Sequence, residues 1–421
     1  VTGSDAKKTE VTERLEKIGA HIFYGHVSGN VCAAQVVVTS TAVKADNPEV
    51  VEAHARKVPV IPRIEMLAEL ARLKYTIAVA GTHGKTTTTS MLASILLEAG
   101  TDPTFIIGGK LNHLQSGAKL GGGEFLVAEA DESDGSFLKL SPTFAIVTNI
   151  DNDHLDYYGS MKKLYSSFAE FTNRVPFYGC SILCADDAGS ARILGQVRRR
   201  LLTYGTKPGP DFVAENIKAS PEGSAFTVVK HETILGELKL KVSGRHNVLN
   251  AMAACVCALE LSIPFDLIAS ALAKFENVQR RLEHKGVKNG AVWVDDYGHH
   301  PTEIRATLSA LREKYPDRRL VVLFQPHRYT RTKLLLKEFA DSFSDASEVA
   351  LLPIYPAGEK PIPGVSSDKL VPLLKKKGVK VVLLKDGKAD RLADRIEAGT
   401  VLVTLGAGDV WKSGQKLFFG E

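Results

Sequence analysis

The segment that most constrains the fold is residues 77–88, which read IAVAGTHGKTTT. Four apolar residues predict a buried strand, and the glycines that follow predict a tight turn into a helix. The expected helix has Met91, Leu92, Ile95 and Leu96 on one face and ends at Gly100. A strand, a glycine turn and a helix in this order are typical of α/β proteins with a parallel sheet.

The same turn predicts a phosphate-binding site. Backbone N–H groups of such a turn and the positive end of the helix attract phosphate oxygens, a lysine can reach terminal phosphates, and a Thr hydroxyl can ligate Mg²⁺. The usual P-loop has another glycine where this chain has Val79, so a shorter turn remains. The alternative is a structural turn with a surface lysine, but the agreement of all elements favours a nucleoside triphosphate. The candidate residues are Gly81, Thr82, Gly84, Lys85, Thr86 and Thr87.

Composition indicates a globular protein with more than one domain. The chain has 421 residues, of which 44% are hydrophobic and 24% charged. No apolar run approaches the length of a membrane span and no signal peptide is recognisable, so we expect no membrane partner. A net charge of +5, without a basic stripe interleaved with aromatics, argues against nucleic acid. Five cysteines without a Cys-x-x-Cys pair predict reduced thiols and a cytoplasmic location, not a zinc site.

Alternating strand and helix patterns predict three α/β domains, at residues 1–75, 76–279 and 280–421. We expect Rossmann-like sheets in the first and third domains. The central domain is expected to be a P-loop α/β domain with a small antiparallel patch between about residues 210 and 242. Residues 1–5 read as the end of a strand with an acidic tip, so we expect a preceding strand and glycine turn to be missing.

Polar residues follow two predicted strands of the central domain. The acidic segment 129–134 comes directly after the apolar run 125–128, and Glu129 lies nearest to that strand. Carboxylates beside a phosphate turn offer the hard oxygen ligands that Mg²⁺ prefers, although a solvated acidic loop is the alternative. His154 follows the next strand, and its chemistry leaves metal binding and an ordinary loop contact equally open.

Other polar segments allow two interpretations each. The short polar side chains of residues 244–250 either cap a helix or hold a base and a ribose. Arg280 and Arg281 are either surface charge or a clamp on phosphate, which guanidinium groups bind in a bidentate manner.

Paired aspartates and paired histidines stand in the segment DDYGHHP, residues 295–301, at the end of a predicted strand. Such pairs are uncommon in a purely structural turn. The neighbouring loop adds His327, Arg328 and Arg331, whose charges suit an anionic substrate. A polar rim that caps the next helix is the alternative.

Taken in order, these segments resemble the Mur ligases of bacterial cell-wall synthesis over essentially the whole chain. The superfamily motifs are GTHGKTT from Gly81, EADESD from Glu129 and GRHNVLNA from Gly244. DDYGHHPTE from Asp295 and FQPHRYTR from Phe324 are similar to members that join L-alanine to UDP-N-acetylmuramate. Muropeptide ligases of cell-wall recycling usually differ at these two segments. A P-loop ATPase switch is the alternative outside the ligases.

The resemblance implies a UDP-sugar domain, a central ATPase domain and a C-terminal amino-acid domain. It implies that ATP and Mg²⁺ (or Mn²⁺) activate the lactyl carboxylate of UDP-N-acetylmuramate as an acyl phosphate, which the amine of L-alanine attacks. It implies a monomer or a dimer.

The resemblance also implies roles for individual residues. Those implied for ATP and metal are Lys85, Thr86, Glu129, His154, His246, Asn250 and Arg281. Those implied for the sugar carboxylate and the amino acid are Asp296, Tyr297, His299, Arg328 and Arg331. Those implied for the uridine side are Asp5, His26, Ser40 and Thr41. Lys85, Arg281, His299, Arg328 and Arg331 are the implied catalytic residues.

Overall fold

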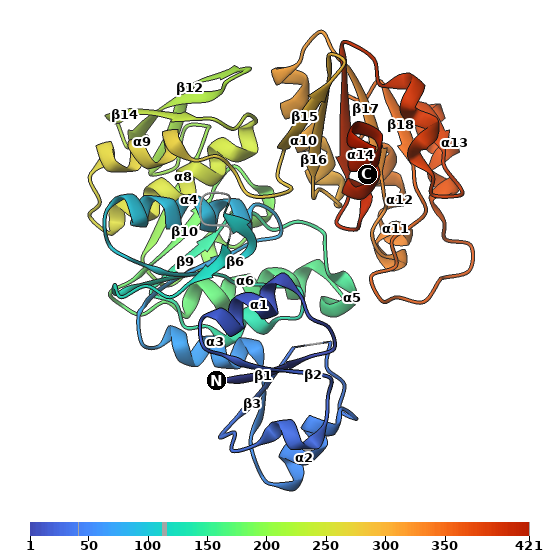
Figure 1. The fold of residues 1–421 in the computed structure, drawn as a ribbon. Helices are drawn as coiled ribbons and strands as arrows, with labels where there is room; N and C mark the ends of the chain where they lie inside the picture. The colour runs from blue at the N-terminus through green and yellow to red at the C-terminus, as the bar shows by residue number, and fades with distance from the viewer. Residues whose placement is uncertain (41, 112–115, 421) are drawn as a thin grey trace. The chain divides into compact units, whose positions relative to one another are not determined.

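The computed structural model describes residues 1–40, 42–111 and 116–420, and the chain forms two compact units (Figure 1). The smaller unit consists of Val1–Lys74 and Lys139–Ser141, and the larger of Tyr75–Leu138 and Pro142–Glu421. Among the described residues, no helix combines the length and apolar character that a membrane span requires.

The smaller unit contains two short parallel strand pairs and three α-helices. The strands are β1 (Thr2–Asp5) with β2 (His21–Tyr24), and β3 (Val37–Thr39) with β4 (Val60–Pro62). The helices are α1 (Glu10–Lys17), α2 (Pro48–Ala55) and α3 (Arg63–Ala71), with the 3₁₀ helix η1 at Ser28–Val31. The apolar residues of α1 stay exposed, at 60% for Val11 and 38% for Leu15, because the four-residue strands β1 and β2 offer little surface to cover them.

A ten-stranded sheet forms the first part of the larger unit, in the order β14-β13-β12-β11-β10-β9-β5-β8-β6-β7. The strands from β12 to β6 in that order run parallel, and β7, β13 and β14 are antiparallel to their neighbours. The expected antiparallel patch is present, and it continues the main sheet because β12 pairs with β11. The bounds are β5 (Tyr75–Ala80), β6 (Thr104–Leu111), β7 (Ser116–Lys119), β8 (Phe125–Glu129), β9 (Phe144–Val147), β10 (Cys180–Cys184), β11 (Leu201–Gly205), β12 (Phe212–Ser220), β13 (Gly223–Lys230) and β14 (Thr233–Leu240).

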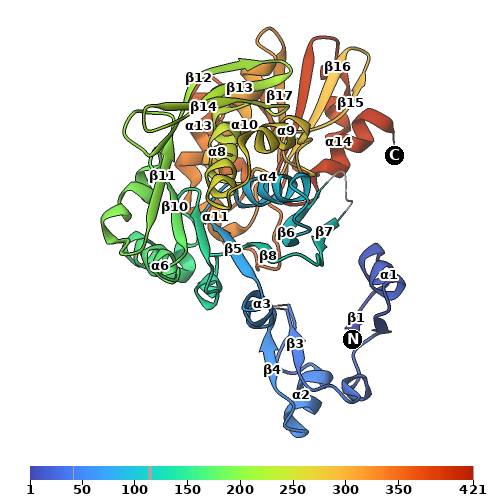
Figure 2. The ribbon, with the colours of Figure 1, turned by 90° about the vertical axis from the view of Figure 1, so that its left-hand side faces the viewer.

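Helices cover this sheet and bury its apolar strands. α4 and α8 lie against the strands of this sheet (Figure 2). Their residues share one core cluster with Ile77 of β5, Val127 of β8 and Ile146 of β9, which are all 0% exposed. The strands are therefore buried as their continuous apolar runs predict. The helices are α4 (Lys85–Glu98), α5 (Leu155–Tyr158), α6 (Met161–Asn173), α7 (Ala188–Ala191), α8 (Arg245–Glu260) and α9 (Phe265–Lys274), with η2 (Ser136–Lys139) and η3 (Leu194–Gln196).

A second sheet follows in the order β15-β16-β20-β17-β18-β19, with β15 antiparallel and the others parallel. Its strands are β15 (Glu283–Lys288), β16 (Ala291–Asp296), β17 (Arg319–Phe324), β18 (Glu348–Leu351), β19 (Lys380–Leu383) and β20 (Thr400–Leu405). The helices are α10 (Pro301–Lys314), α11 (Tyr329–Leu334), α12 (Leu336–Ala340), α13 (Leu370–Lys376) and α14 (Val410–Phe419), with η4 (Ser367–Lys369) and η5 (Ala389–Arg395). This is the doubly wound sheet that the sequence predicts.

The carboxyl ends of the parallel strands carry the polar segments. In the ten-stranded sheet, β5 leads into Gly81, β8 ends at Glu129, and β9 leads to the loop that holds His154. In the second sheet, the loops after β16 and β17 hold the histidine pair and the Arg328–Arg331 turn. Ligand sites of open α/β sheets lie at this edge.

Core packing at β9 gives a first test of the fold. We expect Ile146→Ala to lower the free energy of unfolding by about 2–5 kcal/mol, because it leaves a cavity at a fully buried position. Ile234→Ala on β14 is the matched control, since Ile234 is 70% exposed. This substitution should change the free energy of unfolding by less than about 0.5 kcal/mol. Urea unfolding followed by circular dichroism measures both, and equal effects would contradict the assigned core.

Candidate active site

Two glycines shape the turn between β5 and α4. Gly81 has φ +132° and a Cβ there would lie 2.1 Å from Thr148 Oγ1, while Gly84 has φ +81° and a Cβ would lie 2.4 Å from Asn250 Oδ1. Both positions therefore require glycine. Val79 lies inside β5 and is fully buried, which explains why the turn is shorter than a usual P-loop.

Lys85 is the first residue of α4, and its amine is held by acceptors. Nζ lies 2.7 Å from Glu132 Oε2 and 2.6 Å from the carbonyl oxygen of Gly81. Burial by itself lowers the pKa of Lys85, but the Glu132 carboxylate outweighs burial and raises it. The Lys85 side chain is 16% exposed, so its amine is a half-buried cation, and phosphate oxygens could replace Glu132 as its partner.

The predicted metal ligands stand on neighbouring elements. The Thr86 hydroxyl donates to Glu129 Oε2 at 3.1 Å, and Glu129 Oε1 accepts the backbone N–H of Gly108 at 2.6 Å. Burial raises the pKa of the Glu129 carboxyl, so a nearby cation would favour its charged form. A hydroxyl and carboxylates beside a phosphate turn fit Mg²⁺ or Mn²⁺. His154 Nε2 faces Glu132, with 3.8 Å between Nε2 and Oε1.

A cavity of ≈ 370 Å³ opens beside the turn and is lined by both sheets' loops and helices. Of the predicted residues, it is lined by Gly84, Thr87, His246, Asn250, Arg281 and Asp296. Burial and the nearby Arg281 together lower the pKa of His246 to about 4, so its imidazole is neutral at pH 7. A neutral imidazole and amides are groups that can hydrogen-bond a nucleoside.

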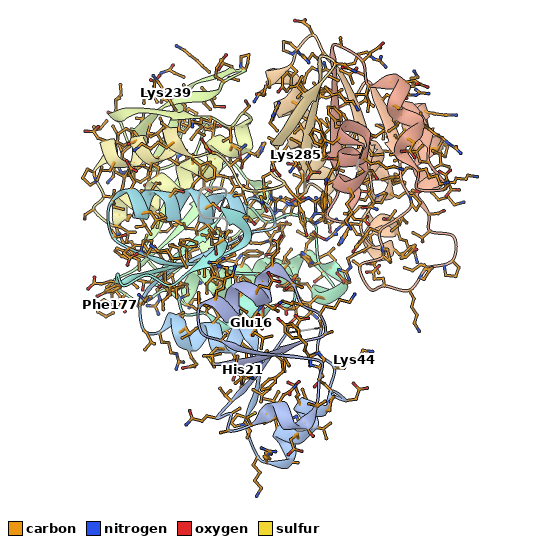
Figure 3. All side chains as sticks on the ribbon, in the orientation of Figure 1. Glu16, His21, Lys44, Phe177, Lys239 and Lys285 are labelled. Carbon is orange, nitrogen blue, oxygen red and sulfur yellow. The ribbon has the colours of Figure 1, made fainter. Side chains whose placement is uncertain are left out.

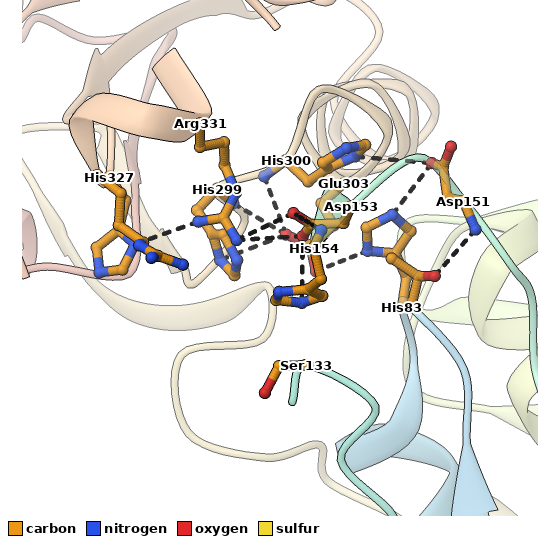
Figure 4. A network of polar contacts seen from close by, with 12 residues as sticks. His83, Ser133, Asp151, Asp153, His154, His299, His300, Glu303, His327 and Arg331 are labelled. Atoms are coloured by element: carbon orange, nitrogen blue, oxygen red, sulfur yellow. Dashed lines mark hydrogen bonds and ion pairs between the residues drawn. The ribbon is translucent and has the colours of Figure 1, made fainter. Parts of the chain in front are cut away.

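His83 connects the phosphate turn to the second sheet (Figure 4). Its Nε2 lies 3.2 Å from Asp151 Oδ2, and its Nδ1 lies 3.3 Å from Glu303 Oε1 on α10. Burial lowers the pKa of His83, but the two carboxylates outweigh burial and raise it to about 9. Asp151 also accepts a hydrogen bond from the hydroxyl of Thr302 on α10 at 2.5 Å. The loop after β9 and the start of α10 are therefore tied together.

Asp296 and His299 occupy the end of β16. Asp296 accepts the backbone N–H groups of Gly298 at 2.8 Å and Leu282 at 2.7 Å, and burial raises its pKa to about 6. Burial lowers the pKa of His299 to about 3, so its ring is neutral at pH 7. His299 Nδ1 faces the carbonyl oxygen of Tyr297 at 3.1 Å, which leaves Nε2 as the ring's other polar atom.

Tyr297 lies between two guanidinium groups. The centre of its ring is 5.2 Å from Cζ of Arg280 and 5.1 Å from Cζ of Arg281. Arg280 is fixed by Asp295 Oδ2 at 2.9 Å and by the carbonyl oxygen of Gly406, whereas Arg281 lines the cavity. Arg281 is therefore the arginine of the pair that can meet a ligand there.

Arg331 lies between the two sheets of the larger unit. Its side chain is 7% exposed, and Nη2 lies 3.1 Å from Asp153 Oδ2 in the loop after β9. Nε is buried with no hydrogen-bond acceptor among the described residues. Arg328 has a left-handed backbone, φ +71°, and its Nε donates to Glu359 Oε1 at 2.7 Å. An unsatisfied buried guanidinium donor suits a carboxylate ligand.

The uridine-side candidates belong to the smaller unit. His26 Nδ1 lies 3.2 Å from Glu49 Oε1, while the Asp5 carboxylate accepts the backbone N–H of Lys7 at 3.0 Å. Ser40 is exposed directly after β3. Thr41 lies outside the described residues.

Several residues at the site were not predicted from the sequence. They are His83, Asn149, Asp151, Asp153, Cys184, Asp186, Asp187, Tyr204, Lys207 and Glu303. Asp186 and Asp187 follow the buried strand β10, and the rule that polar residues gather at strand ends could have found them. The partners of His83 are distant in sequence, so no local pattern indicates them.

Sequence profiles of three Mur ligase domains match the chain. The profile described as Mur ligase family, catalytic domain, matches residues 1–75, that of the Mur ligase middle domain residues 79–258, and that of the glutamate ligase domain residues 280–408.

Individual relatives agree with the profiles. The UDP-N-acetylmuramate–L-alanine ligase of Trichlorobacter lovleyi is 53% identical, covering 99% of this chain and 92% of the relative. The ligase of the same name from Geobacter sp. strain M21 is 52% identical, and the match covers 99% of this chain and 91% of the relative. The crystal structure of UDP-N-acetylmuramate–alanine ligase from Thermotoga maritima has a TM-score of 0.81 at 31% identity. The match covers 99% of this chain and 92% of that chain. The murein peptide ligase of Psychrobacter arcticus has a TM-score of 0.70 at 27% identity, with the same coverage. With half of its residues shared along nearly its whole length, the chain belongs to the Mur ligase family.

Proposed function

We propose that this chain joins L-alanine to the lactyl carboxylate of UDP-N-acetylmuramate at the expense of ATP, in the peptidoglycan synthesis of a bacterial cytoplasm. The observation that carries the proposal is the 53% identity, over 99% of the chain, to a relative named for this reaction. The site adds a reason of its own, since its cations suit the phosphates of ATP and of the UDP-sugar and the carboxylates of the sugar and the amino acid.

A carboxylate and an amine need activation before they condense. A lactyl carboxylate oxygen attacks the γ-phosphorus of ATP, the bond to the bridging oxygen of ADP breaks, and an acyl phosphate and ADP result. Lys85 and Arg281 stabilise the negative charge that develops on the phosphate oxygens, because both cations border the turn or its cavity. When bound, Mg²⁺ neutralises phosphate charge, and Thr86, Glu129 and His154 are the residues that would hold it.

The amine of L-alanine then attacks the acyl carbon, and the tetrahedral intermediate collapses to the amide and phosphate. Arg331 and Arg328 would bind carboxylate groups of the substrates, Arg331 through its unsatisfied Nε. Neutral His299 would orient the amine, because the low pKa makes it a weak base at neutral pH. Asp296 would act by holding Leu282 and Gly298 in place.

Acyl phosphates hydrolyse in water, so the site must close over the intermediate. His83, Asp151 and Asp153 tie the loops of the ten-stranded sheet to α10 and Arg331 of the second sheet. These contacts support a role in closure.

The proposal assigns roles to the three predicted domains. Residues 76–279 would bind ATP and residues 280–421 the amino acid. Residues 1–75 would bind the UDP-sugar, with Asp5, His26, Ser40 and Thr41 as candidates on the uridine side.

Two other functions remain as outcomes of a test. A muropeptide ligase would take a tripeptide in place of L-alanine, and such a ligase is among the similar structures. A P-loop ATPase switch would need no acceptor, and the buried Arg331 would then have no anionic ligand.

An acceptor panel separates these functions. We expect phosphate release with ATP and UDP-N-acetylmuramate to depend on L-alanine over L-Ser, Gly, L-Glu and a tripeptide, because the relatives at 53% and 52% identity are named for L-alanine. Release that responds best to the tripeptide, or that needs no acceptor, would contradict the proposal. Lys85→Ala should abolish release, whereas Lys239→Ala, at an exposed position on β14 (Figure 3), should not change it.

The His83 contacts predict a pH dependence of stability. The folded pKa of about 9 exceeds the ordinary value of 6.5, so the contribution is full below pH 6.5 and is lost as pH rises through 9. We expect His83→Gln to cost on the order of 3 kcal/mol of unfolding free energy near pH 6 and much less near pH 10. Urea unfolding across this range, with the exposed His54→Gln as control, measures the difference. A cost independent of pH would refute the ionised bridge.

A further inference from the structure

The carboxylate of Glu132 has one oxygen with a partner and one without. Oε2 lies 2.7 Å from Lys85 Nζ, whereas no hydrogen-bond donor among the described residues reaches Oε1. The side chain is 1% exposed, so bulk water does not replace the missing partner. A buried carboxylate oxygen without a partner is costly, and in a native protein it indicates a ligand or a function.

His154 faces this unpaired oxygen. His154 Nε2 lies 3.8 Å from Glu132 Oε1 and 3.6 Å from Asp153 Oδ2, and both distances are too long for a hydrogen bond. Two ligands that each lie ~2.1 Å from one cation are separated by roughly 3–4 Å. The two atoms therefore have the spacing of ligands that share an ion.

The backbone supports a fixed position for this histidine. His154 adopts φ +56°, a left-handed conformation that a residue with a side chain rarely takes. Such strain persists where the surrounding structure holds a side chain in a required place.

We propose that Glu132 exchanges partners during the reaction: it is the counter-ion of Lys85 before nucleotide binds, and with His154 it ligates a divalent cation once Lys85 has moved to the nucleotide phosphate. The movement of Lys85 rests on the proposed function. The physical reason is charge, because the departure of Lys85 leaves a buried anion that needs a new cation. Glu132 thus joins Thr86 and Glu129 as a metal-site residue.

Binding of Mn²⁺ without turnover tests the second half of the exchange. Electron paramagnetic resonance measures free Mn²⁺ in the presence of a non-hydrolysable ATP analogue. We expect Glu132→Gln, which keeps the shape and removes the charge, to weaken Mn²⁺ binding by about tenfold or more. The exposed Glu124→Gln, directly before β8 and outside the acidic segment, is the matched control and should bind Mn²⁺ like the unmodified chain. Glu132→Gln and His154→Gln should be non-additive, because both remove a ligand of one ion.

The first half of the exchange is tested without nucleotide. Lys85→Met removes the counter-ion, so the nucleotide-free chain should bind Mn²⁺ about tenfold more tightly. Adding Glu132→Gln to Lys85→Met should abolish that gain. This measurement needs no ligase activity, so its failure is distinct from failure of the proposed function, which the acceptor panel reports.

Two results would overturn the proposal. One is Mn²⁺ affinity with the ATP analogue that Glu132→Gln leaves unchanged, in a variant whose circular dichroism shows it folded. The other is nucleotide-free affinity that Lys85→Met leaves unchanged. Either result would make Glu132 a structural partner of Lys85 alone.

Discussion

Buried cations need counter-charges, and this requirement organises the site. Lys85 is paired with Glu132, Arg331 with Asp153, and Arg281 lies 3.8 Å from Glu303. A buried charge without a partner would be strongly unfavourable, so the carboxylates hold the cations in place before any substrate binds. Phosphates and carboxylates of the proposed substrates can then take over these cations, and the protein carboxylates that they leave need another cation in turn.

The same charges join the two sheets of the larger unit. His83 reaches carboxylates on both sides, and Asp151 and Asp153 of the loop after β9 contact Thr302 of α10 and Arg331. A site assembled in this way is complete only when both sheets contribute. That property suits a reaction whose acyl phosphate must be kept from water.

Local patterns predicted the elements well, because strands buried on both faces and glycine turns have strong sequence signals. The apolar run 77–80 lies within β5 and the run 125–128 lies within β8. Patterns did not predict that β12 joins the antiparallel strands to the main sheet, nor that the apolar residues of α1 stay exposed, because both depend on tertiary pairing. The contact of His83 with Glu303 joins residues that are distant in sequence, so the periodicity of apolar residues along the chain could not predict it. Motif residues such as Lys85 and Thr86 were found because their chemistry is local to one turn.

The most direct measurement is a crystal structure of the full chain with a non-hydrolysable ATP analogue and Mn²⁺. We expect the analogue on the Gly81–Thr86 turn, Lys85 Nζ on its terminal phosphate instead of on Glu132, and anomalous Mn²⁺ density beside Thr86 and Glu129. An analogue bound at the turn while Lys85 still contacts Glu132, or an analogue bound elsewhere, would contradict the exchange of anions on which the proposed chemistry depends.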